Sequence, residues 1–426
     1  MNTVGLRADP HEGVHNIYGY PEGRRLTEFA GFPTMKLALI GVGQAGGKIV
    51  ETILEREEAM QDRSIAEHVM AINTAKSDLD GLSRIPAANR LLIGQTETGG
   101  HGVGGDSDLG AEIAHTELEE IQSSFSPISV HRVDAFLIVA GLGGGTGGGV
   151  APVVAARLQE LYEEPVYVLG ILPGSDEGGI YTLNAARSLT TLVDVADNTL
   201  LFDNEAWRSS GESMDAGYRG MNQELVRQLE PIIWAGEVHD DAATAESVVD
   251  ASEIINTLAA GGISVIGYAE DTDVQSVSTG SKGLLARFSR SSTEPIDSAE
   301  ATNRITSLIR RAALGRLTVP ADIGSTDRGL VVVAGPPEYL NRKGIERGRA
   351  WLEEETGSMQ MRGGDFPWAE DRVAVAVLLA GLHDVSRIQE LKELAVTAQR
   401  NLETSRGRHD EAMANLTADG LDPLIE

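Results

Sequence analysis

From residue 35 onward, short apolar runs alternate with longer stretches in which apolar residues recur every three or four positions. Short apolar runs are typical of buried strands, and the longer spacing is typical of amphipathic helices. Strands in the first half are predicted at residues 37–40, 68–72, 135–140, 166–172 and 198–202. Helices are predicted between them, at residues 46–60, 109–123 and 182–196 and in a stretch that ends at residue 161. This alternation predicts a parallel sheet covered by helices on both faces.

The second half of the chain has a different pattern. One long, mostly apolar helix is predicted at residues 218–234, and another helix follows at residues 248–260. Beyond them, strands are predicted at residues 263–268, 330–334 and 372–379, and helices at residues 298–313 and 342–356. This order predicts a smaller mixed-sheet domain. Residues 385–414 are charged and rich in Ala, which predicts a helical tail with one solvated face.

The composition narrows the classes of protein to which this chain can belong. Acidic residues number 64 against 35 Lys and Arg, and the formal net charge is −29. An acidic surface repels phosphate backbones, which argues against nucleic-acid binding. The scarcity of Lys favours adaptation to concentrated salt, with an ordinary acidic cytoplasmic protein as the simpler alternative. The chain has no Cys, so disulfides, Cys-based metal sites and a Cys nucleophile are excluded.

A first glycine-rich turn, Gly41-Val42-Gly43-Gln44-Ala45-Gly46-Gly47, separates the first predicted strand from the first helix. Glycine lets backbone N–H groups approach phosphate oxygens, and the start of a helix favours negative charge. The spacing G-x-G-x-x-G also occurs in dinucleotide-binding folds, so an NAD-dependent oxidoreductase is an alternative. Such folds usually have an acidic residue at the end of the second strand, where this chain has Asn73-Thr74.

A second glycine run, Gly141-Leu142-Gly143-Gly144-Gly145-Thr146-Gly147-Gly148-Gly149, follows the strand predicted at residues 135–140. A flexible linker does not explain it, because a strand and a helix flank the run closely. We interpret the run as a backbone nest for a phosphate chain, with Thr146 as a further hydroxyl donor. A third cluster lies at Gly99–Asp106. Three such loops suit a nucleoside triphosphate better than a dinucleotide, and the Walker P-loop sequence is absent.

The run from Gly143 to Gly149 resembles the G-G-G-T-G-[ST]-G signature of the tubulin/FtsZ family, with Gly148 where Ser or Thr is usual. Gly41–Gly47, Ala71–Thr74 and Gly99–Asp106 resemble the family's first three phosphate loops. The resemblance runs from Met35 to about residue 400. It implies a nucleotide-phosphate site made of Gly43, Gln44, Ala45, Gly46, Asn73, Gly104, Gly105, Asp106, Gly143, Gly144, Gly145, Thr146 and Gly147.

The resemblance also implies contacts to a guanine base and to the ribose. Asn204 resembles the family Asn at the guanine edge, and Glu177 and Asn184 are implied near the ribose. Tyr218 and Asn222 resemble the tubulin pair that stacks on guanine and hydrogen-bonds it. On the residues alone, Tyr218 and Asn222 are also explained as ordinary positions on a helix face.

Tubulin-like and FtsZ-like features, together with the acidic composition, resemble the CetZ group of archaeal tubulin-like proteins. Residues Asp250 to Leu258 fit the catalytic loop of that group. The resemblance implies that Glu253 lies nearest the attacking water, that Asp250 assists, and that both act on GTP held by the next subunit. The same two acids also fit a helix cap, because Asp250 is a favourable N-cap residue and Glu253 follows three positions later.

The expected fold class is α/β, with a parallel-sheet, tubulin/FtsZ-like GTPase domain joined by a long central helix to a smaller α+β mixed-sheet domain. A flexible N-terminal extension, or an artefact of an upstream start codon, is predicted at residues 1–34. The other parts are predicted as the GTPase domain at 35–214, the central helix and catalytic loop at 215–260, the second domain at 261–384 and the helical tail at 385–426.

The resemblance implies a cytoplasmic, cytoskeletal GTPase that stacks head to tail into filaments and controls cell shape in a salt-loving archaeon. Its ligands would be GTP or GDP with Mg²⁺, for which no protein ligand is assigned, and its partner would be a copy of itself. Nucleic acid is not expected, and membrane contact is expected only through other proteins. A nucleotide-binding scaffold with little turnover is the alternative. Because the net charge opposes stacking at low salt, assembly is expected to strengthen with KCl.

Overall fold

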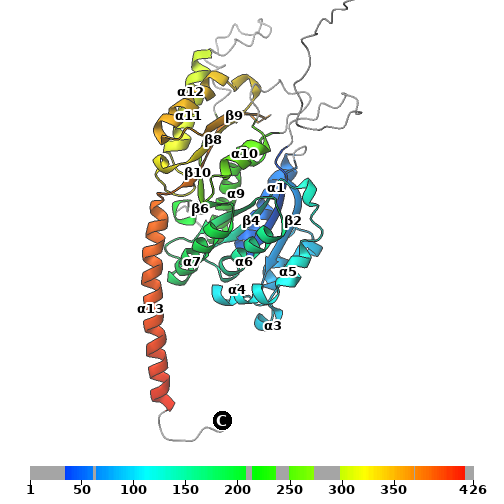
Figure 1. The fold of residues 1–426 in the computed structure, drawn as a ribbon, viewed down its shortest axis with the longest axis vertical. Coiled ribbons are helices and arrows are strands. Elements are labelled where there is room, and N and C mark those ends of the chain that lie inside the picture. The colour runs from blue at the N-terminus through cyan, green and yellow to red at the C-terminus, as the bar shows by residue number, and fades with distance from the viewer. Residues whose placement is uncertain are drawn as a thin grey trace, which may run out of the picture.

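The computed structural model describes residues 34–60, 64–207, 214–236, 249–272, 298–368 and 370–417. The predicted N-terminal extension, apart from Thr34, and the last nine residues of the predicted tail lie outside these ranges. Figure 1 shows a body of strands and helices with one long helix, α13 (Ser386–Thr417), along its side. Among the described residues, no helix is both long enough and apolar enough to cross a membrane.

Within the described residues, ten strands form one continuous sheet in the order β3-β2-β1-β4-β5-β6-β7-β10-β8-β9. Neighbouring strands from β3 to β7 are parallel, β10 is antiparallel to both of its neighbours, and β8 is parallel to β9. The strands are β1 (Leu37–Val42), β2 (Ala66–Asn73), β3 (Arg90–Leu92), β4 (Ala135–Gly141), β5 (Val166–Leu172), β6 (Asn198–Asp203), β7 (Ile263–Asp271), β8 (Arg328–Gly335), β9 (Met361–Pro367) and β10 (Val373–Leu382).

The expected fold class is therefore confirmed: a parallel sheet in the first half and a mixed sheet in the second. The sequence did not indicate that the two sheets are joined. The junction is short, because β6 pairs with β7 only at Thr199–Ile263 and Leu200–Ser264. The chain reaches this junction through the long helix α9 (Met214–Ile233).

Two apolar clusters fill the two faces of the sheet. One cluster joins the strands to α1 (Gly43–Ala59), α9 and α10 (Ala251–Leu258). The other joins them to helices on the opposite face, including α13. These helices are α4 (Ser107–Thr116), α5 (Leu118–Ser124), α6 (Gly145–Leu161), α7 (Gly179–Val195), α11 (Ser298–Leu314) and α12 (Arg342–Thr356). Three short helices complete the described fold: α2 (Lys76–Asp80), α3 (Gln95–Thr98) and α8 (Asn204–Trp207).

One predicted helix was wrong, and two strands, β3 and β9, were not predicted. The helix predicted at residues 109–123 is broken into α4 and α5 at Glu117, whose carboxylate accepts a hydrogen bond of 3.0 Å from the backbone N–H of Gly94. Strand β9 was not predicted, because its sequence contains two Gly and a Pro, which have low strand propensity. It lies at the edge of the sheet, where such residues are tolerated.

Candidate nucleotide site at the carboxyl edge of the sheet

The first glycine turn begins α1 directly after β1. Gly43 has a φ of +72°, and a Cβ atom there would lie 3.0 Å from the backbone nitrogen of Gly147, so this turn contacts the turn after β4. Gln44 and Ala45 are exposed. Gly46 is buried, and a Cβ atom on it would lie 2.0 Å from a carbonyl oxygen of β4. Gly46 therefore lets α1 pack on the sheet, and Gln44 and Ala45 are the parts of this turn open to a ligand.

The turn after β2 is tied to the second glycine run by two threonines. The hydroxyls of Thr74 and Thr146 are 2.7 Å apart and share a hydrogen bond. Asn73 is buried, and its side-chain amide makes hydrogen bonds with residues that follow it closely in the chain. Oδ1 accepts from the backbone N–H of Ala75, and Nδ2 donates to the carboxylate of Asp78. The predicted residue Asn73 thus shapes the turn that brings Thr74 to the glycine run.

Asn184 of α7 joins the third glycine cluster to the second run. Its Nδ2 donates to the carbonyl oxygens of Gly105 at 2.7 Å and Gly143 at 3.0 Å. Its Oδ1 accepts from the hydroxyl of Ser107 at 2.9 Å. The side chain is buried, so these bonds occupy most of its hydrogen-bonding capacity. Asn184 therefore lies at the predicted site as the clamp between two loops.

The glycine run after β4 has two kinds of position. At Gly145, Gly147 and Gly149 a Cβ atom would lie less than 3.0 Å from the backbone of a neighbouring turn, strand or helix, so these glycines permit close packing. Gly144 and Thr146, in contrast, are partly exposed at the start of α6. The first N–H groups of a helix have no partner within it and favour an anion. The start of α6 is therefore suited to a phosphate group.

The third cluster completes this edge of the site. Gly104 and Gly105 both have positive φ values, +61° and +85°, and no atom lies within 4 Å of a Cβ on Gly104. Asp106 caps α4, because its Oδ1 accepts from the backbone N–H groups of Asp108 and Leu109 at 3.0 Å each. Gly104 is exposed and is free to approach a ligand, whereas the Asp106 carboxylate already has a structural role.

The predicted ribose and base residues lie together on the next two loops. Glu177, after β5, accepts through Oε1 from the backbone N–H of Gly174 at 2.8 Å and from Nδ2 of Asn204 at 3.3 Å. Asn204 begins α8 directly after β6. Tyr218 and Asn222 lie one turn apart on α9 and are half-buried, and their contact with a base stays a prediction.

The predicted catalytic acids are at the opposite edge of the sheet. Asp250 is the N-cap of α10, and Glu253 lies in the first turn of that helix. Helix α10 ends against the amino end of β6, where Nδ2 of Asn198 donates to the carbonyl oxygen of Leu258 at 2.9 Å. The glycine loops follow the carboxyl ends of the parallel strands. One chain therefore does not bring Asp250 and Glu253 to its own glycine loops.

The geometry is compatible with both interpretations of Asp250 and Glu253, as a helix cap and as a catalytic pair. Asp250 does cap the helix, because its Oδ1 accepts from the backbone N–H of Glu253 at 3.0 Å. The carboxylate of Glu253 lies instead near Arg362 of β9, with Oε1 4.0 Å from Nη1. Burial raises the pKa of Glu253, Arg362 opposes that rise, and the charge of Asp250 adds to it. Glu253 is thus a partly buried carboxylate that is more basic than usual.

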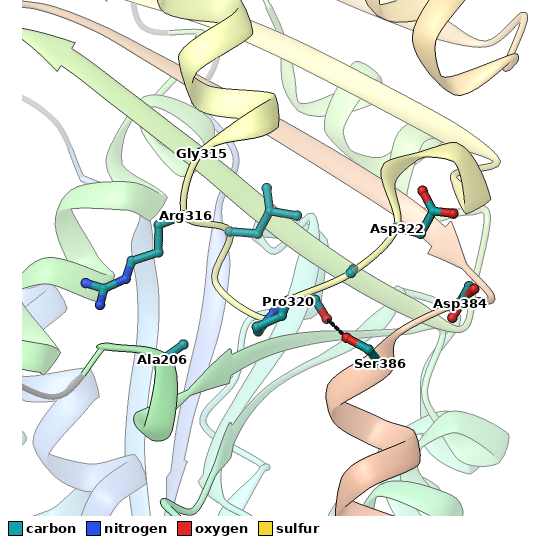
Figure 2. Close-up of a pocket in the computed structure, with 9 residues that line it drawn as sticks. Ala206, Gly315, Arg316, Pro320, Asp322, Asp384 and Ser386 are labelled. Carbon is teal, nitrogen blue, oxygen red and sulfur yellow. Dashed lines mark hydrogen bonds between the residues drawn. The ribbon is translucent and has the colours of Figure 1, made fainter.

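A cavity of about 500 Å³ lies beside the predicted base site (Figure 2). Its walls come from α8, the connection between α11 and β8, and the start of α13. Close to the start of α13, the buried guanidinium of Arg387 binds the buried carboxylate of Asp203, with Nε and Oδ2 3.1 Å apart. Burial raises the pKa of the Asp203 carboxyl, although the charge of Arg387 lowers it.

The donor set fits a nucleotide better than a metal ion bound by protein alone. Backbone N–H groups, two threonine hydroxyls and polar side chains converge at the carboxyl edge. Among the residues that the structure describes, no three His, Asp or Glu gather as metal ligands. Such a site still suits Mg²⁺ bound together with a nucleotide, because Mg²⁺ usually takes most of its ligands from phosphates and water.

Comparisons with known proteins agree with this geometry. Residues 36–212 match the GTPase domain of the tubulin/FtsZ family, and residues 211–397 match the C-terminal domain of tubulin-like CetZ proteins. The tubulin-like protein CetZ1 of Haloferax volcanii is 55% identical over 87% of this chain and 94% of its own length. The solved structure of that organism's CetZ1 as a GDP-bound monomer has a TM-score of 0.74 and 51% identity, and covers 86% of this chain and 100% of the solved one.

A second solved structure, a GTPγS-bound protofilament of CetZ2 from Haloferax volcanii, is 42% identical with a TM-score of 0.73. The match covers 87% of this chain and 100% of the solved chain. These matches favour the nucleoside-triphosphate interpretation of the glycine loops over the dinucleotide alternative. The chain belongs to the CetZ group of tubulin-like proteins, within the tubulin/FtsZ family.

Proposed function

We propose that this chain binds GTP at the carboxyl edge of its sheet and hydrolyses it between subunits stacked head to tail. The observation that carries the proposal is the separation of Asp250 and Glu253 from the glycine loops of the same chain. A second subunit placed with its α10 over these loops would complete the site. An interface that repeats head to tail without closing produces a filament. The solved protofilament of CetZ2 supports this arrangement by family membership.

The chemistry follows from the residues on the two faces. Backbone N–H groups at the start of α6 and in the turn after β1 would hold the phosphates. Glu253 of the next subunit would orient and polarise the attacking water, and its raised pKa makes the carboxylate a better base. Asp250 holds the first turn of α10, and thereby Glu253, in place.

Magnesium would complete this site without a dedicated protein cage. When bound, it offsets the negative charge that develops on the phosphates. Asp78 and Asp106 are carboxylates beside the glycine loops that could hold it through water. We further infer that the protein acts in the cytoplasm as a cytoskeletal filament that controls cell shape, as the family assignment suggests.

A nucleotide-binding scaffold with little turnover is a second candidate. It is favoured by the capping role of Asp250, which gives this residue a structural purpose without any catalysis. In that case filaments would form with GTP bound, and the nucleotide would stay intact.

The test is the GTPase rate per subunit, measured against protein concentration in concentrated KCl for the wild type and for Glu253→Gln. The proposal expects the specific rate to rise steeply with concentration, and the variant to bind GTP and lose turnover. A rate near zero at every concentration, with GTP bound, would favour the scaffold.

A further inference from the structure

The first turn of α13 reaches into the body through one buried cation. The side chain of Arg387 is 4% exposed and that of Asp203 is 2% exposed. Nε of Arg387 donates to Asp203 at 3.1 Å, and Nη2 donates to the carbonyl oxygen of Pro173 at 3.0 Å. Nη1 binds the outward-facing Glu390 on the same helix at 3.0 Å. One guanidinium therefore links three separate parts of the chain.

Two of these parts carry the predicted ribose and base contacts. Pro173 directly follows β5 and begins the loop that contains Glu177. Asp203 is the last residue of β6 and directly precedes Asn204. Glu177 and Asn204 are in turn hydrogen-bonded to each other at 3.3 Å. Arg387 thus fixes the starts of the two loops whose ends meet at the candidate base and ribose site.

Other bonds also hold these loops. The carboxylate of Glu205 accepts from the backbone N–H and the hydroxyl of Ser175, and Nε1 of Trp207 donates to the carbonyl oxygen of Leu317. Figure 2 shows the start of α13 beside the cavity, with the hydroxyl of Ser386 directed at the carbonyl oxygen of Pro320. Ala206 of α8 forms another part of the cavity wall. Because the cavity lies between α8 and the connection from α11 to β8, packing there is incomplete. Arg387 adds to these bonds a buried link that ties the starts of both loops to α13.

Helix α13 continues past the other nucleotide loops after this link. A Cβ atom on Gly179, two residues after Glu177, would lie 3.1 Å from the Cβ of Ala398. Farther along, Arg187 lowers the pKa of Asp108 through a hydrogen bond, and the charge of Arg406 adds to this lowering. Asp108 lies in the first turn of α4, next to the third glycine cluster. Helix α13 therefore lies beside several of the loops that are predicted to contact different parts of the nucleotide.

We propose that Arg387 is a positioning residue for nucleotide recognition, through which the docked α13 helix holds the base and ribose loops in their binding geometry. This inference rests on the proposed function, because it assumes that a guanine nucleotide binds at these loops. Arg387 does not itself reach the ligand in this arrangement. It acts through Asp203 and Pro173, so its loss should affect discrimination between bases as well as the stability of the fold.

The test uses the full chain and compares the dissociation constants of GDP and ADP in concentrated KCl. Arg387→Met keeps a long aliphatic side chain and removes all three polar links. We expect GDP to bind about tenfold more weakly, a change of about 1.4 kcal/mol. ADP, which cannot use the guanine contacts, should weaken less, so the preference for GDP should shrink. The control is Leu352→Ala, a buried change in α12 that lowers the melting temperature and should leave the preference unchanged.

A second variant separates positioning from stability. Arg387→Met leaves the Asp203 carboxylate buried without its partner, which is expected to destabilise the fold. Adding Asp203→Asn removes that charge and should recover most of the melting temperature, while the weakened preference for GDP remains. Recovery of both properties in the double variant would overturn the inference, as would a preference in Arg387→Met equal to that of Leu352→Ala. If the wild type binds no guanine nucleotide, the proposed function fails first and this inference fails with it.

Discussion

The guanidinium of Arg56 and the carboxylate of Glu230 form an ion pair of 2.6 Å that joins the last turn of α1 to the last turn of α9. Helix α1 begins at the first glycine turn, so its last turn lies toward the opposite edge of the sheet. A helix of 20 residues such as α9 spans about 30 Å. The pair therefore fixes the direction of α9, which carries the chain away from the glycine loops and toward Asp250.

This pair predicts a large loss of stability in Glu230→Gln. Glu230 is almost fully buried and also binds Arg372 of β10 at 2.9 Å. Both guanidinium groups also bind the more exposed Glu370, so the variant removes the buried one of their two shared carboxylates. We expect a loss of about 2–3 kcal/mol, less than for wholly buried pairs because Arg56 is partly exposed. Urea unfolding measures it. In the control Glu346→Gln, an exposed pair with Arg342 is broken, and the change should stay within about 0.5 kcal/mol.

Asn184→Ala is expected to loosen the two loops that this residue joins. The carbonyl oxygens of Gly105 and Gly143 and the hydroxyl of Ser107 would lose their partner, at a cost of about 2–3 kcal/mol. Affinity for GTP should fall with stability, because the third cluster would no longer be held against the second run. Thermal unfolding and a GTP titration would check both effects. Thr191→Ala, on the exposed side of α7, is the matched control, and an equally small change in both variants would contradict the clamp.

The same substitution should have opposite signs at two glycines. In Gly149→Ala the new Cβ would lie 2.3 Å from the carbonyl oxygen of Ser107 and 2.7 Å from the backbone nitrogen of Ala111, so α4 and α6 must separate. We expect a loss of about 1–3 kcal/mol. In Gly407→Ala, on α13, no atom lies within 4 Å of the new Cβ, and the helix should gain about 1 kcal/mol. Denaturant midpoints of the two variants would show whether packing or flexibility explains the glycine run.

The glycine loops were predicted because their signal is local. Strand, turn and helix follow one another within a few residues at Gly43 and at Gly145, and glycine has few other uses in that setting. The role of Arg387 was not predictable in this way. It is 184 residues from Asp203 along the chain, and a single Arg in a charged helix has no pattern that indicates burial. The fold brings such pairs together through long-range packing that periodicity does not describe.

The two interpretations of Asp250 and Glu253 show where sequence reasoning stops. The spacing fits a helix cap and a catalytic pair equally well, and the structure gives Asp250 the cap. What the sequence could not provide is the position of α10 at the edge opposite the glycine loops, which depends on the direction of α9. The choice between a cap and a shared catalytic role is therefore a question about assembly.

The acidic limb of the GTPase pH profile should report Glu253. If the carboxylate form is needed, the rate falls as pH falls through the pKa of Glu253, which burial raises above its usual value. Arg362 opposes this rise, so Arg362→Ala should move the limb to higher pH. The effect of pH on stability has the opposite sign to its effect on the rate. A carboxyl whose pKa is raised in the folded state stabilises the fold while it is protonated, and this contribution is lost as pH rises through the folded-state pKa. The rate should be measured under conditions of full assembly, with Arg342→Ala as the control. An unshifted limb would remove Glu253 from the chemistry.

Assembly should strengthen with KCl, because every subunit carries the same large negative charge. The formal net charge is −29, so two subunits repel each other until the ions in solution screen them. The screening length falls from about 10 Å at about 0.1 M salt to about 3 Å at about 1 M, which is shorter than the distance between most surface charges across an interface. Contacts within the interface, including any approach of Glu253 to the nucleotide, act over distances close to this screening length and therefore survive. Sedimentation of GTP-loaded protein from about 0.1 M to about 2 M KCl would measure the effect, with sucrose of matched osmotic strength as the control. Assembly that stays flat or weakens over this range would mean that attraction between specific charged pairs, rather than repulsion between whole subunits, governs stacking.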